Sequence, residues 1–399
     1  MRILWVGTKT PWPPIDGGRL VAATTLQALA EAGHDLTLVA PFDPSREDAA
    51  RAADGLREWC EPVLLESRPR AFAGTALASV ARRRPLSVAR HTLDAVRERV
   101  AQLLAARAFD VVHAEQPQAL AQCQDALDRG VPVVLRAQNV EADLWAASAV
   151  GRPVLGVLAR LEAGRMARFE GEAVRRTAAT VALTARDADR LRVLSGTPEK
   201  VHHVAAPFPS SLPATESPLP GAPAVVLVGS GGWLPNQQGA AWFVRTVWPQ
   251  VSGALPAAAL HVFGDAVGAA VGESGVVRHP APADSREAFA AGATLVVPLP
   301  YGSGVRMKIL EAWARGVPVV ATPAAALGLD AEDGRQLLLA RTAAEFVAAL
   351  RRLSGDPGLG SSLAAAGRES LAARHLPARI ASDLASLYEE CRARPTPRP

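Results

Sequence analysis

The chain has 399 residues, of which 49% are hydrophobic and 21% charged. A chain of this length usually forms two domains, and its composition supplies enough apolar side chains for large buried cores, which excludes wholesale disorder. The formal net charge is only +4, aromatic residues are few, and no known nucleic-acid-binding motif is present, so no nucleic-acid partner is expected.

The three cysteines, Cys60, Cys123 and Cys391, are far apart and odd in number. This spacing fits neither a disulfide framework nor a cysteine metal site, and it favours a reducing compartment. The first residues, MRILWVGTKT, form an apolar run of strand length and lack the pattern of a signal peptide. No apolar stretch is long enough to cross a bilayer. We therefore expect a cytoplasmic protein without a membrane-spanning helix.

Residues 68–107 carry a local excess of positive charge, with nine arginines against Asp94 and Glu98. Such a cluster can bind an anionic membrane surface or a phosphorylated lipid acceptor. The alternative is a solvated helical face that has no partner. The first interpretation predicts peripheral contact with the inner face of the membrane.

The first forty residues show the rhythm of a strand, a loop, a helix and a second strand. An apolar run at 3–6 is followed by a Pro- and Gly-rich loop at 8–18, by helical spacing at 20–32 and by a second apolar run at 35–40. This βαβ pattern predicts a parallel sheet covered by helices. The pattern repeats with strands at 110–113, 131–135 and 180–183 and helices at 118–129, 160–178 and 186–195.

Residues 209–223 are rich in Pro and Ser and show no periodicity, which is typical of a linker. After this segment the rhythm restarts, with strands at 224–228, 259–263, 293–298 and 317–322 and helices at 240–251 and 307–315.

These patterns predict an α/β protein in which two Rossmann-like domains face a central cleft. The domains are expected at 1–208 and 224–375, and a last helix at about 376–391 can pack back on the first domain. Ligands of such sheets bind at the carboxyl ends of the strands. The cleft is therefore the expected site.

The segment YGSGVRMKILEAWARG, residues 301–316, is the strongest candidate for a binding site. It contains a Gly-rich turn that leads into a helix, and this arrangement presents backbone N–H groups to anions. Arg306 and Lys308 stand in the first helical turn, where the helix dipole disfavours cations, so an anionic partner is expected. We predict that Arg306 and Lys308 bind a diphosphate and that Glu311 accepts hydrogen bonds from ribose hydroxyls. The alternative is a simple surface ion pair between Lys308 and Glu311.

Further candidates for substrate binding follow other predicted strands. For each of these residues, the alternative is that it only forms a turn and binds no ligand. For Asn139, the alternative is that it caps the following helix. His113 and Glu115 also end a strand, and a lone histidine there is more often structural. The candidates are Gly17 and Gly18, then Gln138, Asn139 and Glu141, then Gly231, Trp233 and Asn236, and in the segment above Ser303, Gly304 and Val305.

Several motifs of metal and nucleophilic chemistry are absent from the sequence. It has no Walker A sequence, no H-E-x-x-H, no Cys/His cluster and no G-x-S-x-G. Asp187 and Asp189 lie in a predicted helix, where side chains two residues apart diverge. We therefore predict a metal-independent reaction that needs no cofactor.

The chain resembles family 4 retaining glycosyltransferases of the GT-B fold along nearly its full length. The opening strand and Gly-Gly loop are similar to theirs, and four later motifs follow in the family's order. GSGVRMKILEAWARGVPVVAT is the most specific, with Arg306, Lys308 and Glu311 at the family's spacings. The chain has Ser303 where most members have a glutamate, and Gln138 where the subgroup often has a histidine. The motifs are MRILWVGTKTPWPPIDGGR, DVVHAEQ, QNVEADLW, VVLVGSGGWLPNQQG and GSGVRMKILEAWARGVPVVAT.

The resemblance implies transfer of a hexose-type sugar from a nucleotide-diphosphate donor to an acceptor hydroxyl, with retention at the anomeric carbon. Arg306 and Lys308 then stabilise the leaving diphosphate, and Gln138 takes the place of a catalytic side chain on the acceptor side. A carbohydrate, a lipid-linked sugar and a small molecule all remain open as acceptor. A nucleotide-sugar 2-epimerase of the same fold and a non-catalytic nucleotide-sugar-binding subunit are the alternatives.

Overall fold

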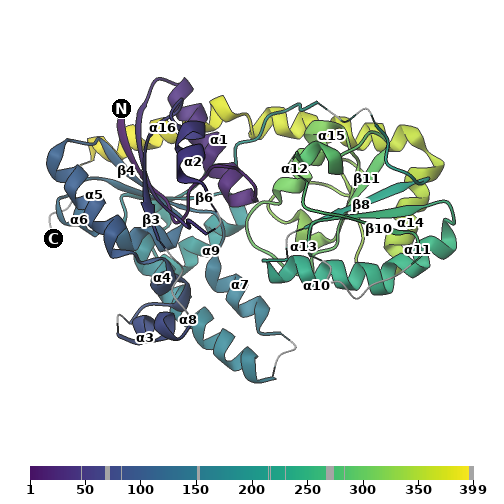
Figure 1. Cartoon of the computed structure of the whole chain (residues 1–399), viewed down its shortest axis with the longest axis horizontal. Coiled ribbons are helices and arrows are strands. Elements are labelled where there is room, and N and C mark those ends of the chain that lie inside the picture. Colours follow the sequence, from purple (N-terminus) through teal and green to yellow (C-terminus); the bar gives the residue numbers. More distant parts are fainter. Residues whose placement is uncertain are drawn as a thin grey trace. The chain divides into compact units, whose positions relative to one another are not determined.

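The computed structural model describes residues 1–45, 47–67, 72–81, 83–150, 153–213, 215, 217–229, 231–266, 274–282 and 284–394. The chain forms two compact units (Figure 1). The first contains residues 1–207, the short segment Ser303–Val305 and the C-terminal segment from Pro377. The second contains Phe208–Gly302 and Arg306–Leu376.

The first unit is built on a seven-stranded sheet in the order β3-β2-β1-β4-β5-β6-β7, and every pairing is parallel. The chain runs outward from β1 in one direction and then returns to continue from β4 in the other. Loops that follow β1 and β4 therefore lie at the point where the strand order reverses, where ligands of such sheets bind. The strands are β1 (Arg2–Val6), β2 (Asp35–Phe42), β3 (Glu61–Glu66), β4 (Val111–Glu115), β5 (Val133–Ala137), β6 (Ala179–Ala182) and β7 (Val201–His203).

Helices connect these strands and cover the sheet. They are α1 (Gly17–Glu31), α2 (Ala49–Leu56), α3 (Phe72–Ala81), α4 (Leu86–His91), α5 (Asp94–Ala106), α6 (Gln124–Asp128), α7 (Glu141–Ser148), α8 (Pro153–Arg176), α9 (Ala185–Ser195) and α16 (Pro377–Ala393).

Several helices of this unit differ from the sequence prediction, among them α8, which begins at Pro153 and not at residue 160. Helix α1 begins at Gly17 instead of residue 20, because Asp16 caps it by accepting from the backbone N–H of Arg19 at 3.0 Å. Gly17 and Gly18 are thus the first helical residues and not loop. The single helix predicted at 118–129 is a 3₁₀ helix at Pro117–Gln122 followed by the short α6.

The second unit has a six-stranded sheet in the order β10-β9-β8-β11-β12-β13, again with every pairing parallel. The strand order reverses between β8 and β11. The strands are β8 (Ala224–Val228), β9 (Ala259–Phe263), β10 (Val276–His279), β11 (Ala293–Val297), β12 (Val319–Ala321) and β13 (Leu338–Leu339). The helices are α10 (Leu234–Trp242), α11 (Trp248–Ala254), α12 (Met307–Arg315), α13 (Pro323–Ala326), α14 (Ala343–Gly355) and α15 (Pro357–Arg374).

The predicted α/β class is confirmed in both units. The strands β8 and β9 and the helix α12 have the predicted bounds. Helix α12 ends where Gly316 adopts the left-handed conformation, with φ of 77°. The helical stretch predicted at 240–251 is longer, since it begins at Leu234 and passes through one π-helical turn at Phe243–Val247. None of the helices in the described ranges is long and apolar enough to cross a bilayer.

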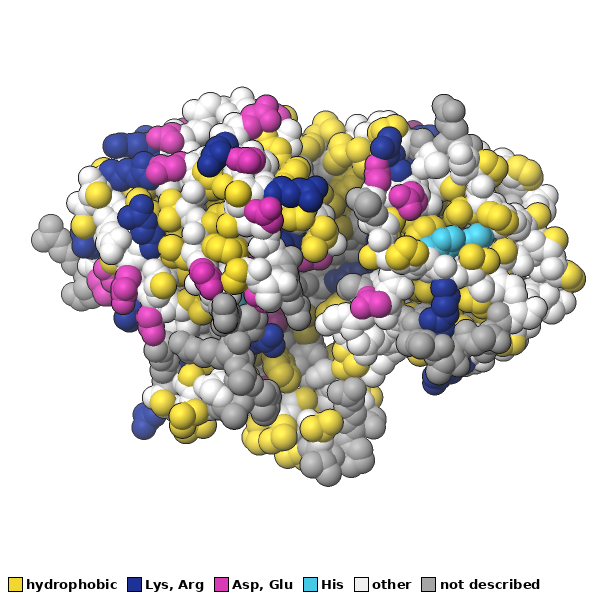
Figure 2. Space-filling view, viewed as in Figure 1, with side chains coloured by type: hydrophobic (Ala, Val, Ile, Leu, Met, Phe, Trp, Pro, Cys, Tyr) yellow, Lys and Arg dark blue, Asp and Glu magenta, His cyan; other side chains and the backbone are white. Residues whose placement is uncertain are grey.

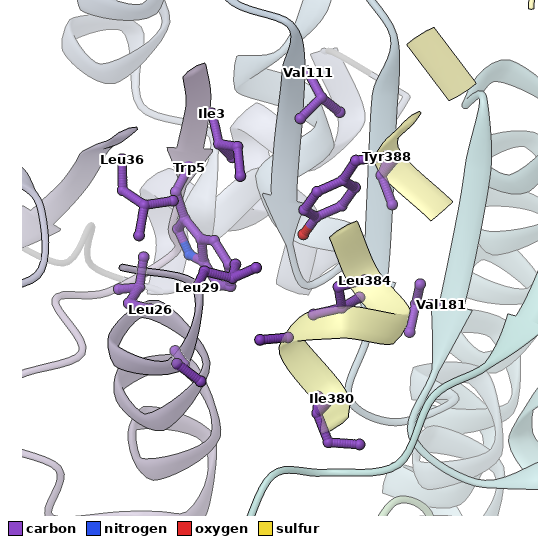
Figure 3. Close-up of a cluster of buried hydrophobic side chains, with 14 of the residues drawn as sticks. Ile3, Trp5, Leu26, Leu29, Leu36, Val111, Val181, Ile380, Leu384 and Tyr388 are labelled. Atoms are coloured by element: carbon purple, nitrogen blue, oxygen red, sulfur yellow. The ribbon is translucent and has the colours of Figure 1, made fainter. Parts of the chain in front are cut away.

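Helix α16 completes the core of the first unit. Its side chains Ile380, Leu384 and Tyr388 lie in the buried cluster that α16 forms with α1 and β4 (Figure 3). Leu384 and Tyr388 are fully buried, and they recur at a spacing of one helical turn. The first unit therefore depends on a segment that follows the whole of the second unit in sequence.

Replacing Leu384 with alanine tests this dependence. We expect Leu384→Ala to lower the free energy of unfolding by about 2–4 kcal/mol, because a fully buried leucine leaves a cavity when it is truncated. Denaturant-induced unfolding measures the change. Ser386→Ala, on the exposed side of the same helix, is the control and should change stability little. Equal stability of Leu384→Ala and the wild type would contradict the packing described here.

Candidate active site

In the second unit, the predicted site residues meet at the carboxyl ends of β8 and β11. Val228 ends β8, and Asn236 stands in the first turn of α10. Gly239 lets this helix approach the end of β11 closely, since a Cβ atom there would lie 2.4 Å from the Pro298 carbonyl oxygen. A small pocket opens at this point of strand-order reversal. It is lined by Leu227, Val228, Gly229, Asn236, Ala240, Val296, Val297, Pro298, Leu299 and Lys308.

The ammonium group of Lys308 lies in this pocket and is held by neutral oxygen atoms. Lys308 Nζ donates to the Val228 carbonyl oxygen at 2.5 Å and to Asn236 Oδ1 at 3.2 Å. Within the described part of the chain, no carboxylate lies within 4.0 Å of this nitrogen. Burial, together with the positive charge of Arg306, lowers the pKa of Lys308 to about 7. The protein therefore holds a partly desolvated cation without an opposite charge.

Arg306 precedes α12 and stacks on Trp233 of the loop after β8. Its guanidinium carbon lies 4.8 Å from the Trp233 ring centroid, within the range of a cation–π contact. Gly302 lies close beneath it, because a Cβ atom at that position would lie 3.3 Å from Arg306 Nη1. The structure thus places Arg306, Lys308, Trp233 and Asn236 around the same strand ends.

Gly231 of the same loop is held by Asp265. The carboxylate Oδ1 of Asp265 accepts from the Gly231 backbone N–H at 2.5 Å, and a Cβ atom on Gly231 would lie 2.8 Å from the Asp265 carbonyl oxygen. Only glycine fits this approach. Gly231, which was predicted to bind substrate, is therefore held in place by Asp265.

Glu311 does not form the ion pair with Lys308 that the sequence left open as an alternative. Its Oε1 accepts from Ser285 Oγ at 2.5 Å and lies 3.0 Å from the Arg315 guanidinium, one turn along α12. That alternative was wrong because Arg315 competes for the carboxylate and Lys308 turns inward to Val228. Glu311 lies on the same helix as Lys308, with its carboxylate already engaged.

The prediction that the glycine turn at 302–304 presents free backbone N–H groups to an anion is contradicted at Gly304. Ser303 Oγ donates to Asp187 Oδ1 at 2.8 Å, and the Gly304 backbone N–H donates to Asp187 Oδ2 at 2.9 Å. The N–H of Gly304 is thus engaged by a carboxylate and is not open to a phosphate. Asp187, in the first turn of α9 and buried, places Ser303, Gly304 and Val305 with the first unit.

Asn139 does not cap the helix that follows it, so this second alternative was also wrong. The N-cap position of α7 belongs to Val140, whose backbone N–H donates to Ser303 Oγ at 2.8 Å. The Asn139 amide, in the orientation that satisfies its neighbours, donates to the Ser303 carbonyl oxygen at 2.8 Å and to that of Gln138 at 3.2 Å. Asn139 therefore holds the segment 303–305 together with Asp187.

Glu170, which the sequence did not single out, stabilises the start of α7. Its carboxylate accepts from the backbone N–H groups of Glu141 and Ala142 at 2.7 and 3.1 Å. Burial raises the pKa of Glu170 to about 8, and burial also raises the pKa of Glu141. The predicted site residue Glu141 is therefore a buried carboxyl group next to a second one.

Gln138 lies in a buried polar network. Its Nε2 donates to Glu115 Oε1 at 2.7 Å and to the Gly18 carbonyl oxygen at 3.1 Å. A Cβ atom on Gly18 would lie 2.7 Å from Gln138 Oε1, so a side chain at this position would displace the Gln138 amide. The amide of Gln138 is therefore engaged by internal partners, and it links the start of α1 to the ends of β4 and β5.

Glu115 is the centre of this network. Arg136 Nη2 lies 2.6 Å from Glu115 Oε2, and both side chains are buried. Burial alone would raise the pKa of Glu115, but the Arg136 guanidinium lowers it to about 2. His113 stacks on Trp5 at 3.8 Å and accepts from or donates to Tyr388 of α16 at 2.6 Å. Burial lowers the pKa of His113 to about 4, so it is a neutral structural residue.

Comparison with known families identifies the chain. Residues 15–207 match the family described as Glycosyltransferase Family 4, and residues 222–356 match the family described as Glycosyl transferases group 1. The chain belongs to the group 1 glycosyltransferases. A search of curated protein sequences found no match.

Solved structures of glycosyltransferases share the fold of this one. The HepE protein of Anabaena in complex with UDP and glucose is 14% identical, with a TM-score of 0.68 over 98% of this chain and 100% of its own. Sucrose-phosphate synthase from Thermosynechococcus elongatus is 16% identical, with a TM-score of 0.69 over 98% of both chains. The lipopolysaccharide galactosyltransferase WaaB is 13% identical, with a TM-score of 0.61 over 98% of this chain and 99% of its own. This glycosyltransferase therefore has the GT-B fold.

The burial of Lys308 predicts how the stability of the folded protein depends on pH. The folded pKa of about 7 lies below that of an unfolded lysine, so the unfolded state binds more protons between about pH 7 and 10. The destabilisation of the folded state by the buried Lys308 charge is therefore largest below about pH 7, and it decreases as the pH rises toward 10. We expect Lys308→Met to raise the melting temperature by about 2–4 °C at neutral pH, and by less near pH 10.

Calorimetric unfolding at both pH values measures this difference. Lys200→Met is the matched control, because Lys200 Nζ donates to the carbonyl oxygens of Arg175 and Thr177 and its loss should lower the melting temperature. A Lys308→Met protein that is less stable than the wild type at neutral pH would show that the ammonium has a structural role.

Proposed function

We propose that this glycosyltransferase moves a hexose-type sugar from a nucleotide-diphosphate donor to an acceptor hydroxyl, with retention at the anomeric carbon. The observation that carries the proposal is the Lys308 ammonium, which faces a pocket at the strand-order reversal of the second unit without a carboxylate partner among the described residues. Burying a cation in this way costs free energy unless an anion completes the site.

Two positive groups suit a diphosphate better than a single phosphate. Arg306 is held by Trp233 and Lys308 by Val228, so both side chains are fixed before the donor arrives. Fixed charges in a partly dry pocket interact more strongly than charges in water. They stabilise the negative charge that grows on the leaving diphosphate, which is the main electrostatic task of such a reaction.

The other predicted residues of the second unit fit the nucleoside part of the donor. Gly231 and Asn236 bring backbone and amide groups to the end of β8. Glu311 lies within one turn of Lys308, and its carboxylate can accept hydrogen bonds from a ribose while it pairs with Arg315. UDP-glucose is the first donor to test, since the HepE protein has been crystallised with it.

The residues of the first unit are proposed to bind the acceptor. Gly17, Gly18, Asn139 and Glu141 lie around the ends of β1 and β5, and Ser303, Gly304 and Val305 join them through Asp187. The acceptor is a carbohydrate, a lipid-linked sugar or a small molecule. Gln138 acts here as a positioning residue, because its amide is engaged by Glu115 and Gly18 and cannot transfer a proton. The leaving diphosphate oxygen then accepts the acceptor proton.

We propose that the two parts of the chain predicted from the sequence bind different substrates. Residues 224–375, apart from Ser303–Val305, bind the nucleotide sugar. Residues 1–208 bind the acceptor, and residues 209–223 link the two parts. We propose that the reaction needs no metal and takes place in the cytoplasm. In support of metal independence, Asp187 is engaged by Ser303 and Gly304, and Asp189 by Arg192 at 2.7 Å, so these two carboxylates do not converge on an ion.

Removing the Lys308 charge tests the proposal. We expect Lys308→Met to lower turnover by roughly a hundredfold or more, because one preorganised contact to a developing negative charge is worth about 3 kcal/mol. The assay follows sugar transfer from UDP-glucose and other nucleotide sugars to a panel of acceptors, with chelator present. Stereochemistry of the product is read by NMR.

Two controls make the result specific. Lys200→Met should retain wild-type turnover, and incubation with donor alone should leave the sugar unchanged, whereas an epimerase would convert it. Normal turnover of a folded Lys308→Met protein, or an inverted product, would contradict the proposed mechanism.

A further inference from the structure

Helix α8 exposes leucines over its N-terminal half. The exposed fractions are 61% for Leu155, 58% for Leu158 and 61% for Leu161. These residues are spaced by three, so neighbours share one flank of the helix. An exposed apolar stripe of this kind needs an explanation, because single exposed leucines are normal but contiguous ones mark interaction surfaces.

The stripe continues the face of α8 that is buried farther along the helix. Glu162 and Met166 are buried there and contact α4, where Glu162 Oε2 accepts from the Leu86 backbone N–H at 2.8 Å. Leu155 and Leu158 precede Glu162 by seven and four residues, and thus lie on the same side of the helix. The core-facing stripe therefore extends beyond the elements that cover it.

Helix α3 adds two more exposed apolar side chains beside α8. Leu77 is 72% exposed and Val80 is 73% exposed. Arg165 of α8 joins the two helices, since its guanidinium donates to the Ser79 carbonyl oxygen at 3.3 Å and to that of Arg84 at 2.5 Å. Figure 2 shows hydrophobic side chains gathered at the lower end of the first unit, where Figure 1 places α3 and α8.

The surroundings of this surface are strongly basic. Segments 72–81, 83–92 and 153–168 contain one acidic residue, Glu162, which is buried and pairs with Arg165. The arginines of these segments are Arg83, Arg84, Arg90, Arg160, Arg165 and Arg168, of which Arg83, Arg90, Arg160 and Arg168 are exposed. Apolar side chains with arginines around them match the interface of an anionic bilayer, which offers both acyl chains and negative head groups.

We propose that Leu77, Val80, Leu155, Leu158 and Leu161 form a docking face that inserts into the surface of an anionic phospholipid membrane. The apolar side chains enter the boundary between head groups and acyl chains, and the arginines contact lipid phosphates.

The sequence predicted a membrane contact from the positive charge of residues 68–107 alone. It did not predict the apolar side chains of the docking face, most of which lie on α8. In that range Arg97 and Arg107 pair with Asp94 and Glu61, and Arg68, Arg70 and Arg82 lie outside the described residues.

A second copy of the chain is a weaker match for the docking face. A twofold contact brings the same patch of both copies together, and it would oppose two arginine-rich surfaces without acidic partners. The positive charge around the face therefore favours a negatively charged occupant. This inference does not depend on the proposed sugar transfer.

Vesicle flotation with the full chain tests the docking face. We expect the wild type to float with vesicles of phosphatidylcholine mixed with phosphatidylglycerol and to bind phosphatidylcholine alone at least about tenfold more weakly. Val80→Glu and the double variant Leu158→Glu/Leu161→Glu should each lose about tenfold or more of the binding to anionic vesicles.

Val193→Glu is the matched control. Val193 is 74% exposed and Val80 is 73% exposed, but Val193 lies on α9, next to the other end of α8, where Gly171 approaches the Leu194 carbonyl oxygen. This variant should bind vesicles like the wild type, and thermal melts should show that all variants remain folded.

Three results would overturn the proposal. The first is that the wild type does not float with anionic vesicles. The second is that Val80→Glu and Val193→Glu lose vesicle binding equally. The third is that variants of the docking face change the oligomeric state in light scattering but leave vesicle binding intact. The last result would identify the surface as an interface between copies.

Discussion

The candidate site of the second unit depends on an ammonium group, that of Lys308, which is buried without a carboxylate partner among the described residues. Lys308 reaches the end of β8 because β8 and β11 are adjacent and parallel, so α10 and α12 both start at the same sheet edge. A carbonyl and an amide oxygen solvate the charge only in part, and the pKa of Lys308 falls to about 7. A site of this kind is poised for an anion, and a glycosyltransferase offers one in the diphosphate of its donor.

Much of the second unit could be predicted from sequence, because its buried strands are short apolar runs and α12 is closed by Gly316. The grouping of Arg306 and Lys308 followed from their place in the first turn of a helix. The partner of Glu311 could not be predicted, since Arg315 and Lys308 stand at equivalent helical spacings on either side of it. Only the inward turn of Lys308 toward Val228 decides between them.

In the first unit, the sequence placed the candidate residues at strand ends but did not predict the contacts that hold them. The sequence placed Asp187 only in a predicted helix, yet its carboxylate accepts from Ser303 and Gly304, which are more than a hundred residues away in the chain. Glu115 and Arg136 end neighbouring strands, and their pairing follows from the β4–β5 register, which no local pattern encodes. Buried polar contacts of this kind depend on tertiary structure, so spacing alone does not find them.

The central claim is that the diphosphate of the donor pairs with Lys308 and stabilises its charged form. Proton uptake on UDP binding tests this claim most directly. Calorimetric titration with UDP in buffers of different ionisation enthalpy counts the protons exchanged. With a pKa of about 7 in the absence of UDP, wild-type protein should take up about 0.8 proton per bound UDP near pH 7.5, as Lys308 becomes fully charged. Lys308→Met should take up none. Binding to the wild type without proton uptake, or the same uptake by Lys308→Met, would contradict the account.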